Sequence, residues 1–220
     1  MRSVKTACCV LAFLVVAAMA HGRTLTNEKA GITLEVPDGW IESAEMAKAV
    51  PPSAELIAGL AATAGGRTFT ALSASLKPNE AVGYTKGLLS SLTNQGFSLS
   101  ANTPVTINGV NFDSYTGTRA DATIPTLQIF SAFGNDHAYA ISLYSQIGDP
   151  THDAELQGLV QSFRFQVPPK PFPTNTAYNI GYQAGRTLGA WAGGTLAIAG
   201  MLACPAALIV AAYFLFRKKK

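Results

Sequence analysis

The feature that most constrains this chain of 220 residues is an uncharged stretch near its C-terminus. Residues 187–216 carry no side chain that is charged at neutral pH, and the stretch exceeds the roughly 20 apolar residues that a helix needs to cross a bilayer. A basic cluster follows at once: Arg217, Lys218, Lys219 and Lys220. Because Lys and Arg are enriched on the cytoplasmic side of membrane spans, we expect one C-terminal transmembrane helix, with residues 217–220 as a cytoplasmic tail.

The N-terminus is consistent with this topology. Residues 1–5 are basic, an apolar run follows from Ala7 to Ala18, and Ala18-Met19-Ala20 is typical of a signal-peptidase site. We therefore predict a signal peptide over residues 1–20. In an alternative topology the first segment stays as a second anchor, but its apolar run is short for a span. A lipoprotein anchor is less consistent still, because Cys8 and Cys9 precede the apolar core instead of following it.

The exported part of the chain has no cysteine, since two of the three leave with the signal peptide and Cys204 lies in the predicted span. Its stability must therefore come from an apolar core, for which residues 21–166 suffice as one domain. Residues 22–185 carry nine basic side chains against all thirteen acidic ones of the chain, so this part is mildly acidic. That balance disfavours nucleic acid as a partner. The lack of glycosylation sequons and of paired cysteines favours a bacterial envelope protein, anchored in the inner membrane with its domain in the periplasm or outside.

Local patterns predict strands that bracket two helices. We expect strands at 24–26 and 31–36 joined by a hairpin, a turn at 37–40, an Ala-rich helix at 53–64 and a strand at 67–76. The next helix covers 80–95, with Asn79 as N-cap and Gly96 as a left-handed terminator. Four further strands follow at about 97–107, 110–119, 126–134 and 137–145, and a last helix at about 151–163. The predicted fold class is α+β, an antiparallel sheet with helices packed on it.

This order of elements resembles the PsbP-like α/β sandwich, a fold group that includes envelope proteins of the DcrB and LpqN type. The resemblance covers about 140 residues and is carried by the run from Gly31 to Trp40, a strand followed by a turn, and by Ser162-Phe163 in the segment that closes the domain. What the resemblance implies is a non-catalytic binding or assembly module, because proteins of this fold mostly dock on other proteins.

Residues 167–176 form a Pro-rich linker. Its four prolines favour an extended, semi-rigid spacer of roughly 3 Å per residue between the domain and the membrane. An alternative is a Pro-rich ligand for an SH3-like partner, which would have to be exported to the same compartment.

Glycines recur every four residues at the start of the predicted membrane helix, which covers 177–216: Gly181, Gly185, Gly189 and Gly193. This spacing keeps them on one helix face and lets another helix backbone approach closely, so we expect helix association and a homo-oligomer. An alternative is that the upstream glycines belong to a flexible juxtamembrane loop. Two further hypotheses for the tail are a temporary anchor cleaved by an intramembrane sortase at Gly193-Gly194 and a dilysine retrieval signal at Lys218.

Catalytic or metal-binding residues are not evident. The only cluster of suitable residues, Asp149, His152, Asp153 and Glu155, lies where the last helix begins. Carboxylates there cap free amides and complement the helix dipole, which explains them without chemistry. We therefore expect no enzyme, no cofactor and no metal.

The expected function is a membrane-anchored, extracytoplasmic module that binds or organises an unknown envelope protein. The alternative is a small-ligand or lipid-binding protein that uses 53–64 as a lid over the sheet, and a hydrolase is a distant third. A flat sheet face with exposed Tyr115, Tyr139 or Tyr144 would favour the first function, whereas an apolar cavity beside 53–64 would favour the second.

Overall fold

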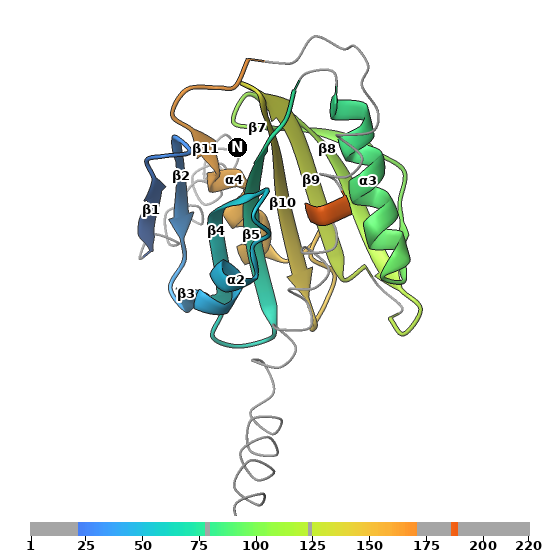
Figure 1. Ribbon diagram of the computed structural model, residues 1–220. Coiled ribbons are helices and arrows are strands. Elements are labelled where there is room, and N and C mark those ends of the chain that lie inside the picture. Colours follow the sequence, from blue (N-terminus) through green and yellow to red (C-terminus); the bar gives the residue numbers. More distant parts are fainter. Residues whose placement is uncertain (1–21, 78–79, 123–124, 171–185, 189–220) are drawn as a thin grey trace, which may run out of the picture.

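The computed structural model describes residues 22–77, 80–122, 125–170 and 186–188, which form a curved eight-stranded antiparallel sheet and a smaller three-stranded one (Figure 1). The fold is α+β, as predicted. The large sheet has the order β3-β4-β5-β10-β9-β8-β6, and β7 also pairs with β8. Its strands are β3 (Trp40–Glu42), β4 (Glu55–Ala62), β5 (Arg67–Ser75), β6 (Phe97–Leu99), β7 (Thr103–Ile107), β8 (Val110–Arg119), β9 (Leu127–Gly134) and β10 (His137–Ser145).

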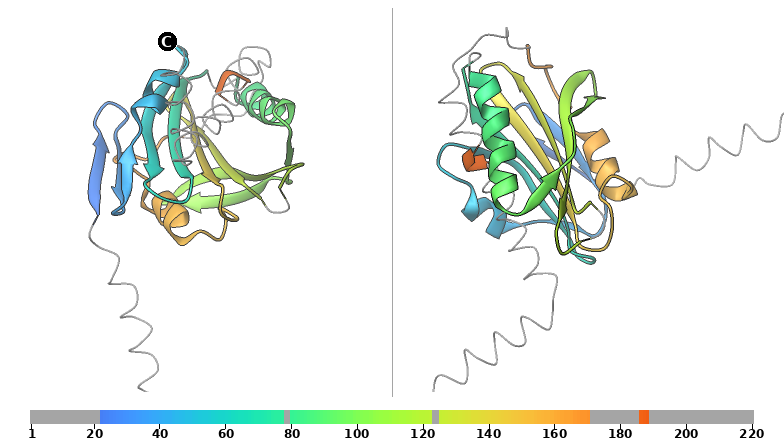
Figure 2. Two further views of the ribbon diagram at one scale, coloured as in Figure 1. Left: turned by 90° about the horizontal axis from the view of Figure 1, so that it is seen from below. Right: turned by 90° about the vertical axis from the view of Figure 1, so that its right-hand side faces the viewer.

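One face of the large sheet is covered by the small sheet and by α4 (Ala154–Ser162), as the views in Figure 2 show. The small sheet consists of β1 (Arg23–Asn27), β2 (Ile32–Val36) and β11 (Arg164–Phe165). Side chains of β2, α4 and the large sheet build the first apolar cluster, which includes Leu34, Phe69 and Leu159 at 1 % exposure or less.

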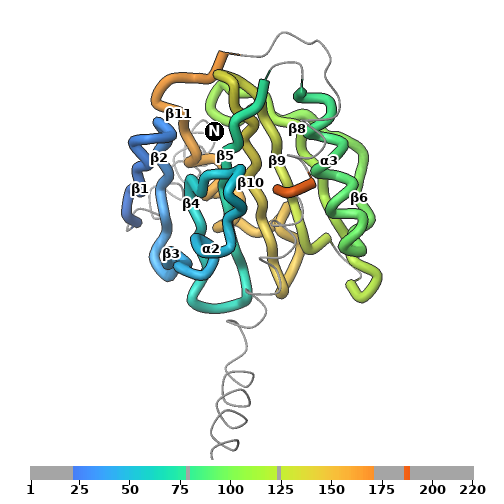
Figure 3. Tube along the Cα trace, in the orientation of Figure 1, coloured from blue at the N-terminus to red at the C-terminus, as the bar shows by residue number. Residues whose placement is uncertain are grey.

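The opposite face carries α2 (Ala44–Ala49) and α3 (Ala81–Asn94), and a second apolar cluster lies beneath them. The path of the chain in Figure 3 shows α2 over β4 and α3 over the strands at the other side of the sheet. Both faces of the central strands are therefore buried, which explains why β9 and β10 are almost continuously apolar or small.

The predicted hairpin turns and the predicted end of α3 at Gly96 are confirmed, whereas the N-cap position of α3 is Glu80. Asn135 and Asp136, between β9 and β10, and Asn108 with Gly109, between β7 and β8, all have positive φ, as tight hairpin turns require. Gly96 ends α3 at φ +87° and Phe97 is buried behind it. The predicted N-cap of α3, Asn79, lies outside the described residues.

The helix predicted over 53–64 is wrong, because these residues form β4. Leu56 pairs with Leu72 and Leu60 with Phe69 of β5, and Trp40 of β3 pairs with Ala62 on the other side. Helix propensities differ by only tenths of a kcal/mol per residue, so a place between two strands overrides the preference of an Ala-rich segment. The sequence patterns also missed α2 and β3, and the strand predicted over 97–107 is two strands, β6 and β7, that pair with successive parts of β8.

The first residues of the predicted Pro-rich linker lie on the domain. Pro169 is buried, and the backbone of Lys170 bonds to Asn135 in the β9–β10 turn, with Asn135 N donating to Lys170 O at 3.2 Å and Lys170 N donating to Asn135 Oδ1 at 3.1 Å. After α4, on the first face of the sheet, the chain thus reaches the end of strands β9 and β10 at this turn.

Candidate binding site

The strand register shows which side chains face α2 and α3. Residues that pair across antiparallel strands point to the same side of the sheet, and alternate residues share a face. Leu72 faces the same side as its partners Ala140 on β10 and Leu56 on β4, and Thr70 faces that side with Ser142. Around Leu72, the side chains in the middle of this face are small, and all are buried: Thr70, Ala74, Ala138, Ala140, Ser142 and, on β9, Ser131.

Two helices border these small side chains and stand higher above the sheet. On the β4 side, α2 contributes Met46, whose sulfur accepts a hydrogen bond from Thr70 Oγ1 at 3.8 Å. On the β9 side, α3 contributes Tyr84, Leu88 and Leu92, all at 0 % exposure. The ring of Tyr84 meets Phe133 of β9 edge-to-face at 5.5 Å. We use the name α2–α3 groove for this part of the sheet face, defined by the six small side chains together with Met46, Tyr84, Leu88 and Leu92, all 7 % exposed or less.

A side chain from beyond the linker is buried in this cluster. Residues 186–188 are helical and lie over the strands beside α3 (Figure 1). Leu188 is 1 % exposed and belongs to the same apolar cluster as Met46, Leu72 and Leu88. Its two neighbours, Arg186 and Thr187, are exposed, so this short segment directs its apolar side chain toward the groove and its polar side chains outward.

Two buried hydroxyl groups on the groove face have no hydrogen-bond partner among the described residues: Tyr84 Oη on α3 and Ser131 Oγ on β9. Burial raises the pKa of the Tyr84 hydroxyl well above its usual range, so it is a neutral O–H group at any physiological pH. An unpaired buried hydroxyl costs about 1–3 kcal/mol, and such groups are rare in folded domains. A polar group brought by an occupant of the groove would relieve this cost.

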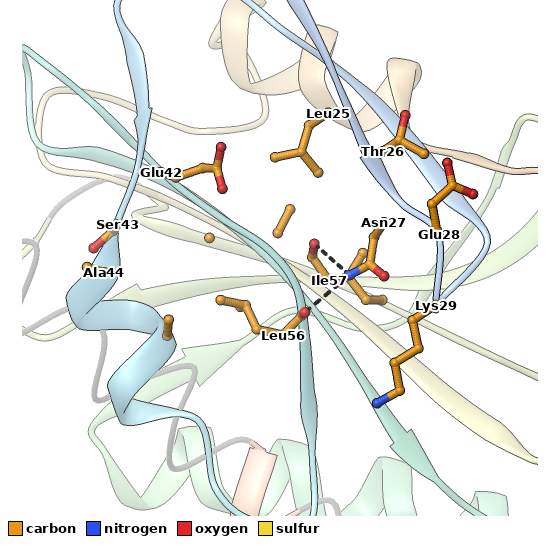
Figure 4. Close-up of a pocket in the computed structure, with 13 residues that line it drawn as sticks. Leu25, Thr26, Asn27, Glu28, Lys29, Glu42, Ser43, Ala44, Leu56 and Ile57 are labelled. Carbon is orange, nitrogen blue, oxygen red and sulfur yellow. Dashed lines mark hydrogen bonds between the residues drawn. The ribbon is translucent and has the colours of Figure 1, made fainter.

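A second concavity of about 680 Å³ lies at the edge of the sheet, between the β1–β2 hairpin, α2 and β4. Figure 4 shows Leu25, Leu56 and Ile57 on its walls, with Glu28 and Lys29 nearer its rim. The pairing register of β4 shifts between Leu56 and Ala58, which leaves the carbonyls there without a regular strand partner. This irregular strand edge is one wall of the pocket.

Most polar groups of this pocket are already engaged within the protein. Asn27 Nδ2 donates to the carbonyls of Leu56 and Ile57 at 3.4 and 3.3 Å (Figure 4). Lys29 pairs with Glu55 at 3.0 Å, and Ser43 Oγ caps α2 by accepting from Met46 N. Since specific small-ligand sites need a few convergent polar groups, the pocket offers shape but little polar recognition.

The acidic cluster at the start of α4 is structural, as predicted. Asp153 is the N-cap and accepts bonds from the backbone amides of Glu155 and Leu156 at 3.1 and 3.0 Å. Asp149 Oδ1 accepts from Thr151 N and Oγ1. His152 is exposed and its Nε2 lies 4.0 Å from the Asp149 carboxylate. Within the described ranges, no three His, Cys, Asp or Glu side chains gather as a metal site would require.

Arg67 of β5 joins this helix start to the turn that carries Trp40. Its guanidinium lies 3.4 Å from Asp153 and 3.0 Å from Glu155, and it also covers the Trp40 ring at 5.6 Å. Trp40 is 4 % exposed, and its Nε1 donates to Glu155 at 3.0 Å. The carboxylates are therefore engaged in holding α4 against the sheet.

Several predicted functional residues lie outside the part of the chain that the structure describes. These are the residues for helix association, Gly181, Gly185, Gly189 and Gly193, the basic residues 217–220, and the signal peptide at 1–20. Among the residues that are described, no helix is both long and apolar enough to cross a membrane.

Exposed tyrosines on the sheet were expected for a protein-binding module, and a cavity beside 53–64 for a ligand-binding one. Tyr115 and Tyr139 are 7 % and 6 % exposed and Tyr144 is half-buried, so the sheet offers no flat aromatic surface. A concavity does lie beside β4. The groove itself was missed, although the alternation of small residues in 137–145 was a signal for it.

No family of related sequences matches the chain, and no curated protein is similar to it. The structure is similar to the solution structure of cyanobacterial PsbP from Synechocystis, with a TM-score of 0.46 and 13 % identity over 68 % of this chain and 95 % of that one. It is also similar to LpqN of Mycobacterium tuberculosis, a protein involved in cell envelope biogenesis, with a TM-score of 0.37 and 16 % identity over 66 % of this chain and 86 % of that one. The PsbP-like resemblance expected from the sequence is thus also found by comparison of structures, at the level of the fold.

Proposed function

We propose that the protein is a membrane-anchored, extracytoplasmic and non-catalytic module that binds an apolar helical segment of another envelope protein in its α2–α3 groove. The burial of Leu188 carries this proposal. It supports a groove that admits a leucine from a helical segment outside the sheet and its covering helices. The signal-peptide pattern and the basic end of the chain support the export and the anchor.

The chemistry of the groove favours a helix as occupant. Small side chains on its floor allow the backbone of an incoming helix to approach the sheet, and the apolar walls formed by Met46, Leu88 and Leu92 cover the side chains that point inward. The unpaired hydroxyls of Tyr84 and Ser131 offer hydrogen bonds to a polar group of such a segment. The glycine face of residues 181–193 remains a separate proposal for association between copies of this chain in the membrane, in a state in which Leu188 has left the groove.

A second candidate function is the binding of a small apolar ligand or lipid. The concavity beside β4 and the burial of Tyr115 and Tyr139 favour it. Against it stands the engagement of the pocket's polar side chains in contacts that hold the β1–β2 hairpin and α2 in place.

Photo-crosslinking from the groove tests the proposed function. A benzoylphenylalanine is placed at Leu89, a half-buried residue of α3 that packs against the groove cluster, in the full chain in intact cells. The control carries it at Ile147, which is 67 % exposed in the loop after β10. We expect a discrete adduct with another protein from position 89 that is absent from position 147.

Mass spectrometry of the crosslinked products separates the alternatives. Adducts with the mass of a membrane lipid, at position 89 alone, would mean that the groove holds a lipid and not a helical segment of another protein. Equal adducts at both positions, or none beyond crosslinks within the chain, would contradict binding of another protein in this groove.

A further inference from the structure

The most informative unexplained contact in the protein is that of Leu188, a residue that the sequence places at the start of the membrane anchor. It is buried on the α2–α3 side of the large sheet, whereas α4, the last helix of the domain, lies on the opposite side. The chain must therefore change faces between Ser162 and Leu188.

The described residues show where this change of face begins. Pro169 is buried at the β9–β10 turn, and Lys170 makes two backbone hydrogen bonds there with Asn135. At Gly134 a Cβ atom would lie 2.6 Å from Pro169 Cβ and 2.7 Å from Lys170 O, so this glycine allows the close approach of the two segments. The chain is thus held by packed contacts at the end of β9 and β10, as far as Lys170.

We propose that the groove is an intramolecular docking site whose resting occupant is Leu188, on this chain's own helical residues 186–188. This inference rests on the proposed function, because it names the first segment that the groove holds. A helical segment of another protein then gains access only by displacing Leu188. The groove is closed in the free protein and opens when a competing apolar helix is present.

The tether favours the chain's own segment over that of a second copy. Two groups joined by a short linker meet at an effective concentration on the order of millimolar, and the linker here starts from a fixed point at Lys170. A second copy could compete with the chain's own segment only at a comparable concentration, on the order of millimolar. Docking is also compatible with the anchor, because residues 189–216 still exceed the roughly 20 apolar residues needed for a span.

The arrangement has a consequence for the position of the domain. With Leu188 docked, the apolar stretch left for the span, 189–216, begins directly after a residue that is part of the domain's core cluster. The groove side of the domain is then held next to the lipid surface, where apolar helices of other membrane proteins emerge, and not at the end of an extended spacer.

Disulfide trapping in the full chain tests the proposal. Cys8, Cys9 and Cys204 are first replaced by serine or alanine, and Leu188→Cys is then combined with Ala74→Cys or with Ala138→Cys, two small residues of the groove face. The control pair combines Leu188→Cys with Ala132→Cys, which is equally buried but belongs to the cluster on the opposite face. Each protein is oxidised in membranes, and the linked peptides are identified by mass spectrometry.

We expect a disulfide within one chain from at least one groove pair and none from the control pair, because a disulfide forms only between Cα atoms about 4.4–6.8 Å apart. Mixing copies labelled with light and heavy nitrogen shows whether the linked peptides come from one chain. Peptides linked between two chains would overturn the intramolecular assignment in favour of a second copy. Failure of both groove pairs, in variants that unfold at the same urea concentration as the parent, would overturn docking altogether.

The two proposals can fail independently. The disulfide reports only on the chain's own segment, whereas the crosslink from Leu89 reports on another protein. An intact intramolecular disulfide with no protein adduct would leave the docked segment as a structural element and remove the proposed binding function.

Discussion

Single residues at the start of α4 show how a cluster that looks like a metal site serves stability instead. Asp153 satisfies two backbone amides of the helix and also pairs with Arg67, whose other partner is Glu155. His152 directly precedes Asp153 in the sequence, yet its side chain is 87 % exposed. The residue types are those of a metal site, but only the position of the helix shows where their side chains point.

Replacement of Asp153 by Ala removes the helix cap and one of the two carboxylates beside Arg67. We expect a loss of about 1–2 kcal/mol in the free energy of unfolding, mostly from the cap, measured as a lower urea midpoint. The matched control is His152→Ala, for which we expect a change within about 0.5 kcal/mol because the side chain is exposed. An equal loss in both variants would mean that the cap is not the function of Asp153.

The buried hydroxyl of Tyr84 makes a prediction about alkaline pH. Its pKa is raised in the folded protein by burial, while the unfolded chain titrates near 10. Below pH of about 10 both states keep the proton; above it the unfolded state binds fewer protons, so folding stability falls as pH rises. Tyr115, whose pKa is raised by burial and by the Asp113 charge, and Tyr139, whose pKa is raised by burial, contribute in the same direction.

Tyr84→Phe should therefore stabilise the protein by about 1 kcal/mol at neutral pH, because it removes an unpaired buried hydroxyl and keeps the ring contact with Phe133. Its stability should also fall less steeply above pH of about 10 than that of the parent. Urea unfolding at a series of pH values measures both effects. A destabilised variant at neutral pH would show that the hydroxyl has a partner, such as a group of the docked segment.

At the scale of elements, two glycines lie in opposite environments. One tests helix propensity and the other tests close packing. Gly158 lies on the exposed side of α4, and a Cβ atom there would meet nothing within 4 Å. Gly134 ends β9 directly under Pro169 and Lys170. Nothing in the described contacts requires a glycine at position 158, whereas Gly134 makes room for Pro169 and Lys170.

Gly158→Ala should raise the free energy of unfolding by about 0.5–1 kcal/mol, the usual gain in an exposed helix interior. Gly134→Ala should lower it, because the new methyl group would overlap with Pro169 and displace residues 167–170 from the β9–β10 turn. Thermal melts of the full chain measure both changes. If both variants were stabilised, the close contact at the turn would not exist in solution.

β4, which the sequence patterns predicted as a helix, shows the limit of local patterns. Its Ala- and Leu-rich sequence favours a helix, and the irregularity at Ile57 hides the alternation of a strand. Its neighbours β3 and β5 supply the hydrogen bonds that decide the conformation. By contrast, β5, α3 and α4 were predicted nearly at their true bounds, because their periodicity and end signals lie within the segment itself.

At the scale of the whole molecule, the proposed single C-terminal anchor makes a prediction about topology. A reporter fused after Lys220 should be active only if it functions in the cytoplasm, and one inserted at Thr174 only if it functions outside, because basic residues stay on the cytoplasmic side of a span. Paired reporters of both kinds at each position provide the control. The reverse pattern of activity would contradict the single C-terminal anchor.

The sequence by itself determined the α+β class, the antiparallel order of β8, β9 and β10 and the capping role of Asp153, because hydrophobic period, turn residues and helix-end signals act over a few neighbouring residues. The tertiary structure alone decided that 55–62 is a strand, that small side chains of β5, β9 and β10 share one face, and that Leu188 packs against that face. These three facts depend on pairings and contacts between residues far apart in the chain. Local patterns do not show which strands become neighbours. The candidate site consists of contacts between such distant segments, so local patterns could not predict it.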